Sequence, residues 1–171
     1  MLQKQGHSNL EHRFLKVKPI PLSTACYRIV SRKYDVLNTN GSLLYFGRYS
    51  NKEFLVLYTA DFEELCEAEL ARKTKIKTKF IYKIAKLNLR LRKIIDLTSE
   101  KNIKLLNIQR DDLIGDNWDI PQLIAVLAYQ KGYEGLLVPS ATEKGNNIIL
   151  FPDNFSKNSA IKKMAEKIRR L

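Results

Sequence analysis

The stretch from Asp119 to Pro139, DIPQLIAVLAYQKGYEGLLVP, decides the fold class. Its first half has the features of a helix, because Asp119 can cap it, Pro121 lies near the first turn and Gly132 ends the apolar run. Its second half contains the short apolar run 136–138 and stops at Pro139, which is typical of a buried strand. A helix followed directly by a buried strand predicts a protein of mixed α and β structure.

Outward from this stretch, the pattern predicts more strands than helices. Alternating or continuous apolar runs predict strands at 26–30, 43–46, 54–58, 75–82, 87–92 and 148–151. Helical spacing predicts helices at 61–72, after Thr98, and from Ser159 to the end of the chain. Because helices are interspersed irregularly among the strands, the predicted class is α+β.

The length and the residue pattern predict one domain. The chain has 171 residues, and a second independent core would be hard to build at that size. Residues 1–22 are basic and polar and end with Pro19 and Pro21, so we expect a loose lead-in. Residues 23–171 are expected to form a single domain that includes a basic C-terminal helix.

Charge points to an anionic partner. The 30 Lys and Arg residues against 18 Asp and Glu give a formal net charge of +12. A nucleic acid, an acidic protein and a phosphate-bearing ligand all fit that charge, which alone does not choose among them. With 44% apolar and 28% charged residues, the composition excludes disordered and collagen-like classes.

Cysteine and histidine usage excludes several kinds of site. Cys26 and Cys66 lie far apart, so we expect two buried, reduced thiols rather than a disulfide framework or a zinc site. The two histidines, His7 and His12, lie in the polar N-terminal stretch, which argues against a histidine base or a metal site. With no apolar run of membrane-spanning length and no signal peptide, the chain is expected to be soluble and cytoplasmic.

One glutamate of the helix predicted at 61–72 points inward. With 100° per residue, Glu69 lies about 20° from Phe62, inside the apolar stripe. Glu63, Glu64 and Glu67 point at least about 100° away, as solvated charges do. Burying an unpaired carboxylate is costly, so Glu69 belongs either to a structural salt bridge, with Arg28 as the obvious partner, or to an active site.

Several short motifs, in order and at fitting distances, resemble the RES domain family, which is named for its Arg, Glu and Ser residues. The segments that carry the resemblance are Tyr27–Val30, Gly47–Ser50, Tyr58–Ala60, Glu69, Ile95–Thr98, Gly132–Ala141 and Asn147–Pro152. The resemblance runs from about Tyr27 to Phe155. The chain departs from the family pattern where Tyr49 and Ser50 replace Trp and Asn, and where Phe151 replaces Asn.

The resemblance implies a fold, a reaction and a partner. RES proteins are similar in fold to ADP-ribosyltransferases, with split, mostly antiparallel β-sheets, flanking helices and a cleft for NAD. Many are toxins of type II toxin–antitoxin pairs that deplete NAD by cleaving the nicotinamide–ribose bond, with phosphate or water as acceptor. This implies NAD as substrate, inorganic phosphate as a co-substrate in some members, no bound cofactor, and a cognate antitoxin that carries a DNA-binding part. The oligomeric state stays open.

The resemblance also implies roles for individual residues. Glu69 would stabilise the positive charge that develops on the ribose. Arg28 would hold the pyrophosphate or an attacking phosphate, Tyr58 would stack on nicotinamide or donate a hydrogen bond, and Ser140 would bind ribose or phosphate. Arg48 and Asn147 are further candidates for binding NAD. No metal ligands are expected.

Two alternative functions remain. Lys and Arg alternate with Thr and aliphatic residues from Lys75 to Arg92, which could form a nucleic-acid-binding face of a non-catalytic module. A solvated strand face explains the same alternation, and we expect no specific nucleic-acid binding by this chain. The second alternative keeps the fold but transfers ADP-ribose to a protein target.

Trp118 is expected in the core.

Overall fold

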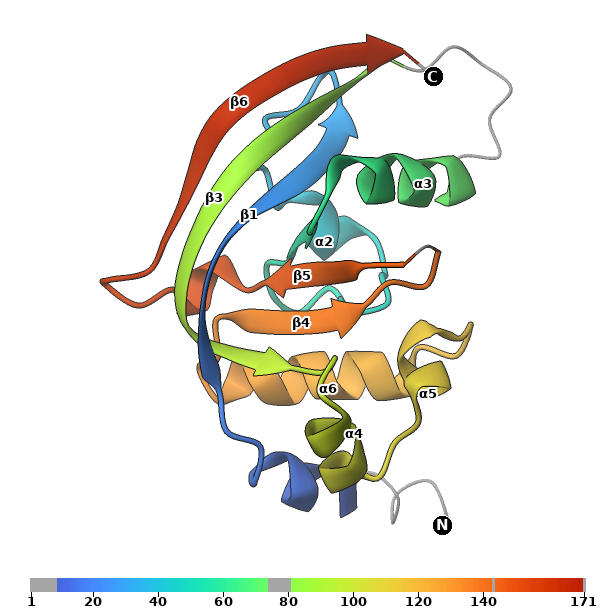
Figure 1. Ribbon diagram of the computed structural model, residues 1–171, viewed down its shortest axis with the longest axis vertical. Helices are drawn as coiled ribbons and strands as arrows, with labels where there is room; N and C mark the ends of the chain where they lie inside the picture. Colours follow the sequence, from blue (N-terminus) through green and yellow to red (C-terminus); the bar gives the residue numbers. More distant parts are fainter. Residues whose placement is uncertain (1–8, 74–80, 143, 171) are drawn as a thin grey trace.

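The strands form one strongly curved sheet in the computed structural model, which describes residues 9–73, 81–142 and 144–170 (Figure 1). They are β1 (Ile20–Ser31), β2 (Leu57–Ala60), β3 (Ile81–Asp96), β4 (Gly135–Pro139), β5 (Asn146–Leu150) and β6 (Ala160–Arg170). In the order β1-β2-β5-β4-β3, the last strand pairs again with β1, so five strands close into a barrel and β6 lies along β3. The β3–β4 pair is parallel and the other pairs are antiparallel.

The long strand β3 joins the two ends of the molecule. Its residues Leu87, Leu89 and Leu91 are buried, whereas the residues between them are exposed, as the predicted alternation requires. One edge pairs with β1 along most of its length, and the other pairs with β6 and then, at 94–96, with β4. The strand predicted at 87–92 is therefore confirmed and is longer than expected.

Helices cover the barrel on two sides. They are α2 (Gly41–Leu44), α3 (Glu63–Lys73), α4 (Glu100–Leu106), α5 (Arg110–Ile114) and α6 (Asp119–Gln130), with a 3-10 helix, η1 (Pro152–Asn154). In Figure 1, α6 lies along β4, and α3 lies on the opposite side of β5. The helix-and-strand prediction for 119–139 is confirmed, and Gly132, with a φ of 70°, ends α6 in a conformation that favours glycine.

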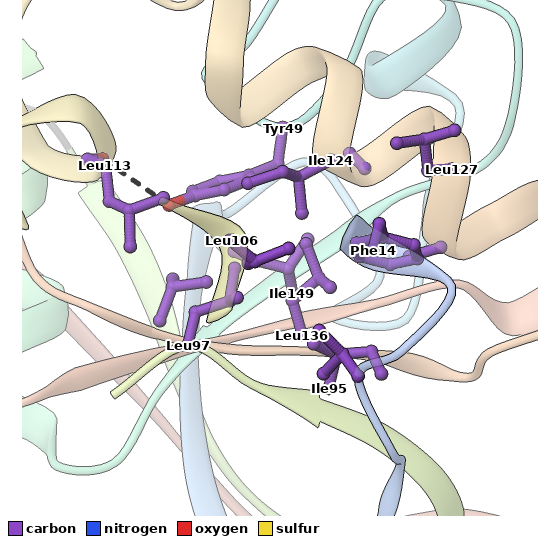
Figure 2. Packing of buried hydrophobic residues seen from close by; sticks show 14 of the residues in the cluster. Phe14, Tyr49, Ile95, Leu97, Leu106, Leu113, Ile124, Leu127, Leu136 and Ile149 are labelled. Atoms are coloured by element: carbon purple, nitrogen blue, oxygen red, sulfur yellow. Dashed lines mark hydrogen bonds between the residues drawn. The ribbon is translucent and has the colours of Figure 1, made fainter. Parts of the chain in front are cut away.

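Three groups of buried side chains hold these elements together. The largest lies between the sheet and α4, α5 and α6, and Figure 2 shows part of it. A second fills the barrel around Cys26, Leu87 and Ile148. The third is small and lies under α3; its buried members are Ala60, Leu65, Cys66, Tyr82 and Ile84. The helix that carries Glu69 therefore rests on the smallest of the three groups.

The C-terminal segment is a strand, so the predicted terminal helix from Ser159 was wrong. Residues 160–170 pair antiparallel with β3, from Arg90↔Ala160 to Ile81↔Arg170. Of the apolar residues that favoured a helix, Ile161 packs against the barrel core, whereas Met164 and Ile168 are both 56% exposed. The hydrogen bonds offered by the long edge of β3 outweigh the local periodicity, as tertiary context often does in sheets.

The segment 43–46 also differs from its prediction. A strand was expected there, but Gly41–Leu44 is a helical turn that begins in the Asn-rich turn at 38–41. Leu44, Tyr45 and Phe46 are exposed, at 63%, 73% and 61%. A strand needs a partner edge, and the nearby edges of β1, β2 and β5 are already paired with one another or with β3 and β4.

The N-terminal lead-in is not loose in its described part. Residues 9–14 are helical, and Leu10, Phe14 and Val17 are buried in the largest core cluster. Leu10 and Phe14, four residues apart, lie on one face of this helix, a signal that the polar composition around them hides. β1 already begins at Ile20, before the expected domain boundary at 22.

Other predictions are confirmed or lie outside the described residues. Strand 26–30 lies within β1, and Cys26 and Cys66 are free and buried. Most of the strand predicted at 75–82, and the first third of the basic alternation from Lys75 to Arg92, lie outside the described residues. No helix within the described ranges is both long and apolar enough to cross a membrane.

Candidate active site

A cleft of about 800 Å³ brings together most of the residues predicted for the site. Arg28, Arg48, Tyr58, Glu69 and Asn147 all line it. They come from β1, the 45–50 loop, β2, α3 and β5, so the closed barrel positions side chains that are far apart in the sequence. Pockets of this size accommodate small ligands and cofactors.

Glu69 occupies the cleft wall and is held by two side-chain donors. Its Oε1 atom accepts hydrogen bonds from Ser140 Oγ at 3.1 Å and from Asn147 Nδ2 at 2.6 Å. Ser140 is only 4% exposed, and its Oγ also accepts a bond from the backbone N–H of Thr142. Ser140 follows β4 directly and Asn147 lies on β5, so two neighbouring strands orient the carboxylate.

Arg28 does not pair with Glu69. Its Nη1 donates to the carbonyl oxygen of Tyr58 at 3.0 Å and its Nη2 to that of Asn38 at 2.8 Å, and none of the ion pairs between described side chains joins it to Glu69. Its Nε has no hydrogen-bond partner among the described residues. The predicted alternative of a structural Arg28–Glu69 salt bridge is therefore wrong.

The guanidinium of Arg28 is held by hydrogen bonds, but none of the ion pairs between described side chains neutralises its charge. Burial lowers the pKa of its guanidinium to about 10, although the nearby Cys66 and Asp35 raise it, so the group stays cationic at neutral pH. Two backbone carbonyls fix its orientation with partial charges only. A partly buried cation that lines a cleft and has no carboxylate ion-pair partner among the described residues is suited to bind an anion such as phosphate.

Tyr58 is a neutral phenol held against the 47–50 turn. Burial raises its pKa above the usual range of a tyrosine, and its hydroxyl oxygen accepts a hydrogen bond from the backbone N–H of Tyr49 at 3.1 Å. Gly47 permits this approach, because a Cβ there would lie 2.5 Å from the Tyr58 hydroxyl. Tyr58 can therefore provide a ring and a hydroxyl to the cleft, but not a base at neutral pH.

The 47–50 turn is anchored in the main core. Gly47 and Ser50 exchange backbone hydrogen bonds, and the ring of Tyr49 is 2% exposed. The Tyr49 hydroxyl donates to the carbonyl oxygen of Leu113 at 3.4 Å, as the dashed line in Figure 2 marks. Tyr49, one of the departures from the family pattern, therefore preserves a buried aromatic at this position.

Arg48 points to a different part of the cleft. Its Nη1 donates to the carbonyl oxygen of Leu113 at 3.2 Å and also to that of Gly115. Its guanidinium carbon lies 5.8 Å from the centre of the Trp118 ring. Trp118 also lines the cleft and is 38% exposed, so its predicted place in the core was wrong.

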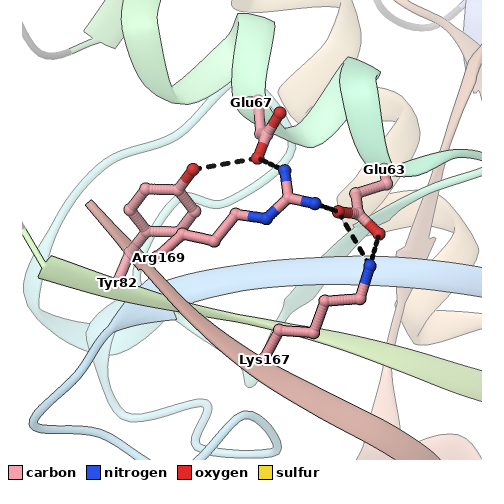
Figure 3. A network of polar contacts seen from close by, with 5 residues as sticks. All are labelled: Glu63, Glu67, Tyr82, Lys167 and Arg169. Atoms are coloured by element: carbon pink, nitrogen blue, oxygen red, sulfur yellow. Dashed lines mark hydrogen bonds and ion pairs between the residues drawn. The ribbon is translucent and has the colours of Figure 1, made fainter. Parts of the chain in front are cut away.

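The outer face of α3 is tied to the C-terminal strand. Figure 3 shows Arg169 between Glu63 and Glu67, Lys167 on Glu63, and the Tyr82 hydroxyl donating to Glu67. Glu63 and Glu67, expected to be solvated, are instead paired and only 16% and 27% exposed. The helix is thus held by ionic contacts on one face and by Glu69 on the other.

Some site residues gave little signal in the sequence. Asn38 contributes only its backbone carbonyl, which no motif reveals. Trp118 did offer a signal, because the polar segment Gly115–Asn117 and Asp119 surround it, whereas a core tryptophan usually has apolar neighbours. Among the described residues, no cluster of three or more potential metal ligands occurs.

The chain is similar to a known family and to known proteins. The RES domain model matches residues 25–169. NAD(+) phosphorylase MbcT of Mycobacterium tuberculosis (strain ATCC 25618 / H37Rv) is 28% identical over 130 residues, which cover 71% of this chain and 70% of MbcT. MbcT of Mycobacterium bovis gives the same values.

A solved structure has the same fold. The crystal structure of the M. tuberculosis MbcT–MbcA toxin–antitoxin complex matches with a TM-score of 0.83 at 20% identity, covering 94% of this chain and 92% of the matched chain. The family model spans most of the sequence, including the strands and the helix that build the cleft. The chain therefore belongs to the RES domain family.

Proposed function

We propose that this protein is an NAD-depleting toxin that cleaves the bond between nicotinamide and ribose, with phosphate as acceptor. The observation that carries the proposal is the Glu69 carboxylate, fixed by Ser140 and Asn147 in the wall of a cleft that Arg28 also lines. In a member of the RES domain family, an anion and an unneutralised cation in one cleft suit a substrate with a reacting ribose and a pyrophosphate.

The chemistry needs few protein groups. When the glycosidic bond breaks, nicotinamide leaves with the bonding electron pair and becomes neutral, and the ribose gains positive charge. Glu69 would stabilise that charge and hold the ribose hydroxyls. Because the leaving group is already cationic in NAD, no strong general acid is required. Neutral Tyr58 would contact nicotinamide or donate a hydrogen bond to phosphate. Ser140, which is hydrogen-bonded to Glu69, would bind the ribose.

Phosphate is favoured over water as the acceptor. The matched relatives from Mycobacterium are named NAD(+) phosphorylases. A phosphate oxygen would attack the ribose carbon from which nicotinamide departs, giving nicotinamide and phosphorylated ADP-ribose. Arg28, which stays cationic and lines the cleft, could hold that phosphate. Asn147 and Arg48 would contribute to binding NAD.

The proposal includes a partner and a compartment. The matched solved structure is a toxin–antitoxin complex, which supports a cognate antitoxin for this chain, and we expect that antitoxin to carry a DNA-binding part. A net charge of +12 suits an acidic partner protein. Both NAD and the antitoxin would be met in the cytoplasm. Kinship of the barrel with the ADP-ribosyltransferase fold is part of the same proposal.

The test is incubation of the partner-free protein with NAD, with and without inorganic phosphate, followed by mass analysis of the products. We expect nicotinamide and an ADP-ribose phosphate when phosphate is present. ADP-ribose alone, in both arms, would indicate water as acceptor. Unchanged NAD with folded protein would contradict the proposal. Labelled protein would instead support an ADP-ribosyltransferase, and salt-sensitive nucleic-acid binding without turnover would support the non-catalytic module.

A further inference from the structure

The exposed aromatic side chains gather in one place. Four aromatic residues are exposed among the described residues, and all four line the cleft. They are Tyr34, Tyr45, Phe46 and Trp118. Aromatic rings that stay in solvent cost hydrophobic free energy, and a group of them at a cleft marks a binding surface for an apolar or planar ligand.

Trp118 is the ring that the structure supports best. It precedes α6, and the Arg48 guanidinium lies over it, itself fixed by the carbonyl oxygens of Leu113 and Gly115. A ring that is braced by neighbours and partly exposed to a cleft can stack on a planar ligand with little loss of side-chain entropy.

A continuous wall leads from Glu69 to Trp118. Asn147, which binds Glu69, lies on β5, and β5 pairs with β2, where Tyr58 faces Ile149. The Tyr58 hydroxyl contacts the backbone of the 47–50 turn, which places Arg48 next along the wall. The carboxylate and the indole therefore line one cleft, and the cationic Arg48 side chain lies over the indole.

We infer that Trp118 forms a subsite for the adenine ring of the dinucleotide, with Arg48 beside the pyrophosphate. This inference rests on the proposed function, because it takes the Glu69 end of the cleft as the place of the nicotinamide riboside. The arrangement matches the order of a dinucleotide: a reacting sugar, an anionic linkage and a second planar base. The aromatic end therefore determines specificity for a dinucleotide over a mononucleotide.

Comparing NAD with nicotinamide mononucleotide tests the subsite, because the mononucleotide has the same scissile bond but no adenine. In Trp118→Ala, KM for NAD should rise roughly tenfold, the size of one base–aromatic stack, with kcat retained. Cleavage of the mononucleotide should not change, and Trp118→Phe should restore most of the affinity for NAD. An unchanged KM for NAD in Trp118→Ala, or equal losses with both substrates, would overturn the inference.

A binding measurement makes the test independent of turnover. Trp118 is the single tryptophan of the chain, so its fluorescence reports directly on this site. Titration with AMP should quench it in the parental protein and in Glu69→Gln alike, whereas the mononucleotide should have little effect. Absence of quenching by AMP would overturn the subsite. If neither nucleotide is cleaved, the proposed function fails, and the AMP titration still decides the inference.

Discussion

Two inward-pointing glutamates, Glu134 and Glu69, differ in how the protein holds them. Glu134 is fully buried, and its two oxygens accept bonds from the backbone N–H groups of Arg92, Lys93 and Ser156 and from the Ser159 hydroxyl. Burial alone would raise the pKa of Glu134, but these hydrogen bonds outweigh it and lower the pKa to about 2. Glu134 thus joins β3, β4 and the segment before β6.

Glu69 has side-chain donors instead, from Ser140 and Asn147, and it lines the cleft. Backbone N–H donors are fixed in position by the fold, so a carboxylate that accepts hydrogen bonds from them stabilises the folded structure. A carboxylate bound by two side chains at a cleft wall is oriented without being enclosed. Inward direction alone therefore does not distinguish the two glutamates, whereas the type and number of their donors do.

The largest effect is expected for Glu134→Ala, which takes the acceptor from three partly buried backbone N–H groups, those of Arg92, Lys93 and Ser156. A buried donor left unsatisfied costs about 1–3 kcal/mol, and solvent can reach these donors in part, so the free energy of unfolding should fall by about 3 kcal/mol in total. Denaturant unfolding measures it. Glu100→Ala is the matched control, because its side chain is 89% exposed and its ion pair with the exposed Lys104 lies on the surface. Equal stability of the two variants would contradict the structural role of Glu134.

Glu69→Gln should affect activity rather than stability. Loss of a group that stabilises transition-state charge reduces turnover by at least about 10²-fold, and we expect that loss in NAD cleavage. The amide can keep one acceptor oxygen, so the melting temperature should stay near the parental value. Glu64→Gln, an exposed glutamate of the same helix, is the control and should change neither quantity. A folded Glu69→Gln protein with parental turnover would refute the catalytic assignment.

The low pKa of Glu134 predicts how stability depends on pH. Because the folded-state pKa is about 2 and the ordinary value is 4.5, the carboxylate stabilises the fold above about pH 4.5. That contribution should diminish as the pH falls from 4.5 toward 2. The stability difference between the parental protein and Glu134→Ala should therefore shrink over this range in urea unfolding. A difference independent of pH would show that the glutamate acts through packing alone.

Local pattern predicted the parts of the fold that are decided locally. The helix and strand of 119–139 and the inward direction of Glu69 follow from caps, periodicity and spacing. Partners far away in the sequence decide the rest. β6 is a strand because β3 offers an edge, and the barrel closes because β1 pairs with β3, neither of which periodicity within a segment can reveal.

The same division explains what could be predicted of the site. Arg28, Tyr58 and Glu69 were predicted by family motifs, and the structure brings them to one cleft. The partners of Arg28 are backbone carbonyls, which have no side-chain identity to read from a sequence. The exposed position of Trp118 depends on its contact with Arg48 at the start of α6, and these two residues are 70 positions apart in the sequence.

The smallest effect is expected for Arg169, a residue of β6 that contacts the face of α3 opposite Glu69. Arg169 contacts Glu63 at 2.5 Å and Glu67 at 2.6 Å, but its side chain is 40% exposed, so solvent weakens these pairs. Arg169→Ala should lower the melting temperature slightly at low salt and reduce NAD cleavage far less than Glu69→Gln does. At 1 M salt, where the Debye length is about 3 Å, its difference from the parental protein should largely disappear.

Arg170→Ala, the same change at the next residue of β6, is the control and should show no such salt dependence. If Arg170→Ala matches Arg169→Ala at every salt concentration, the ion pairs do not hold the helix, and Glu69 relies on Ser140, Asn147 and the small cluster beneath α3.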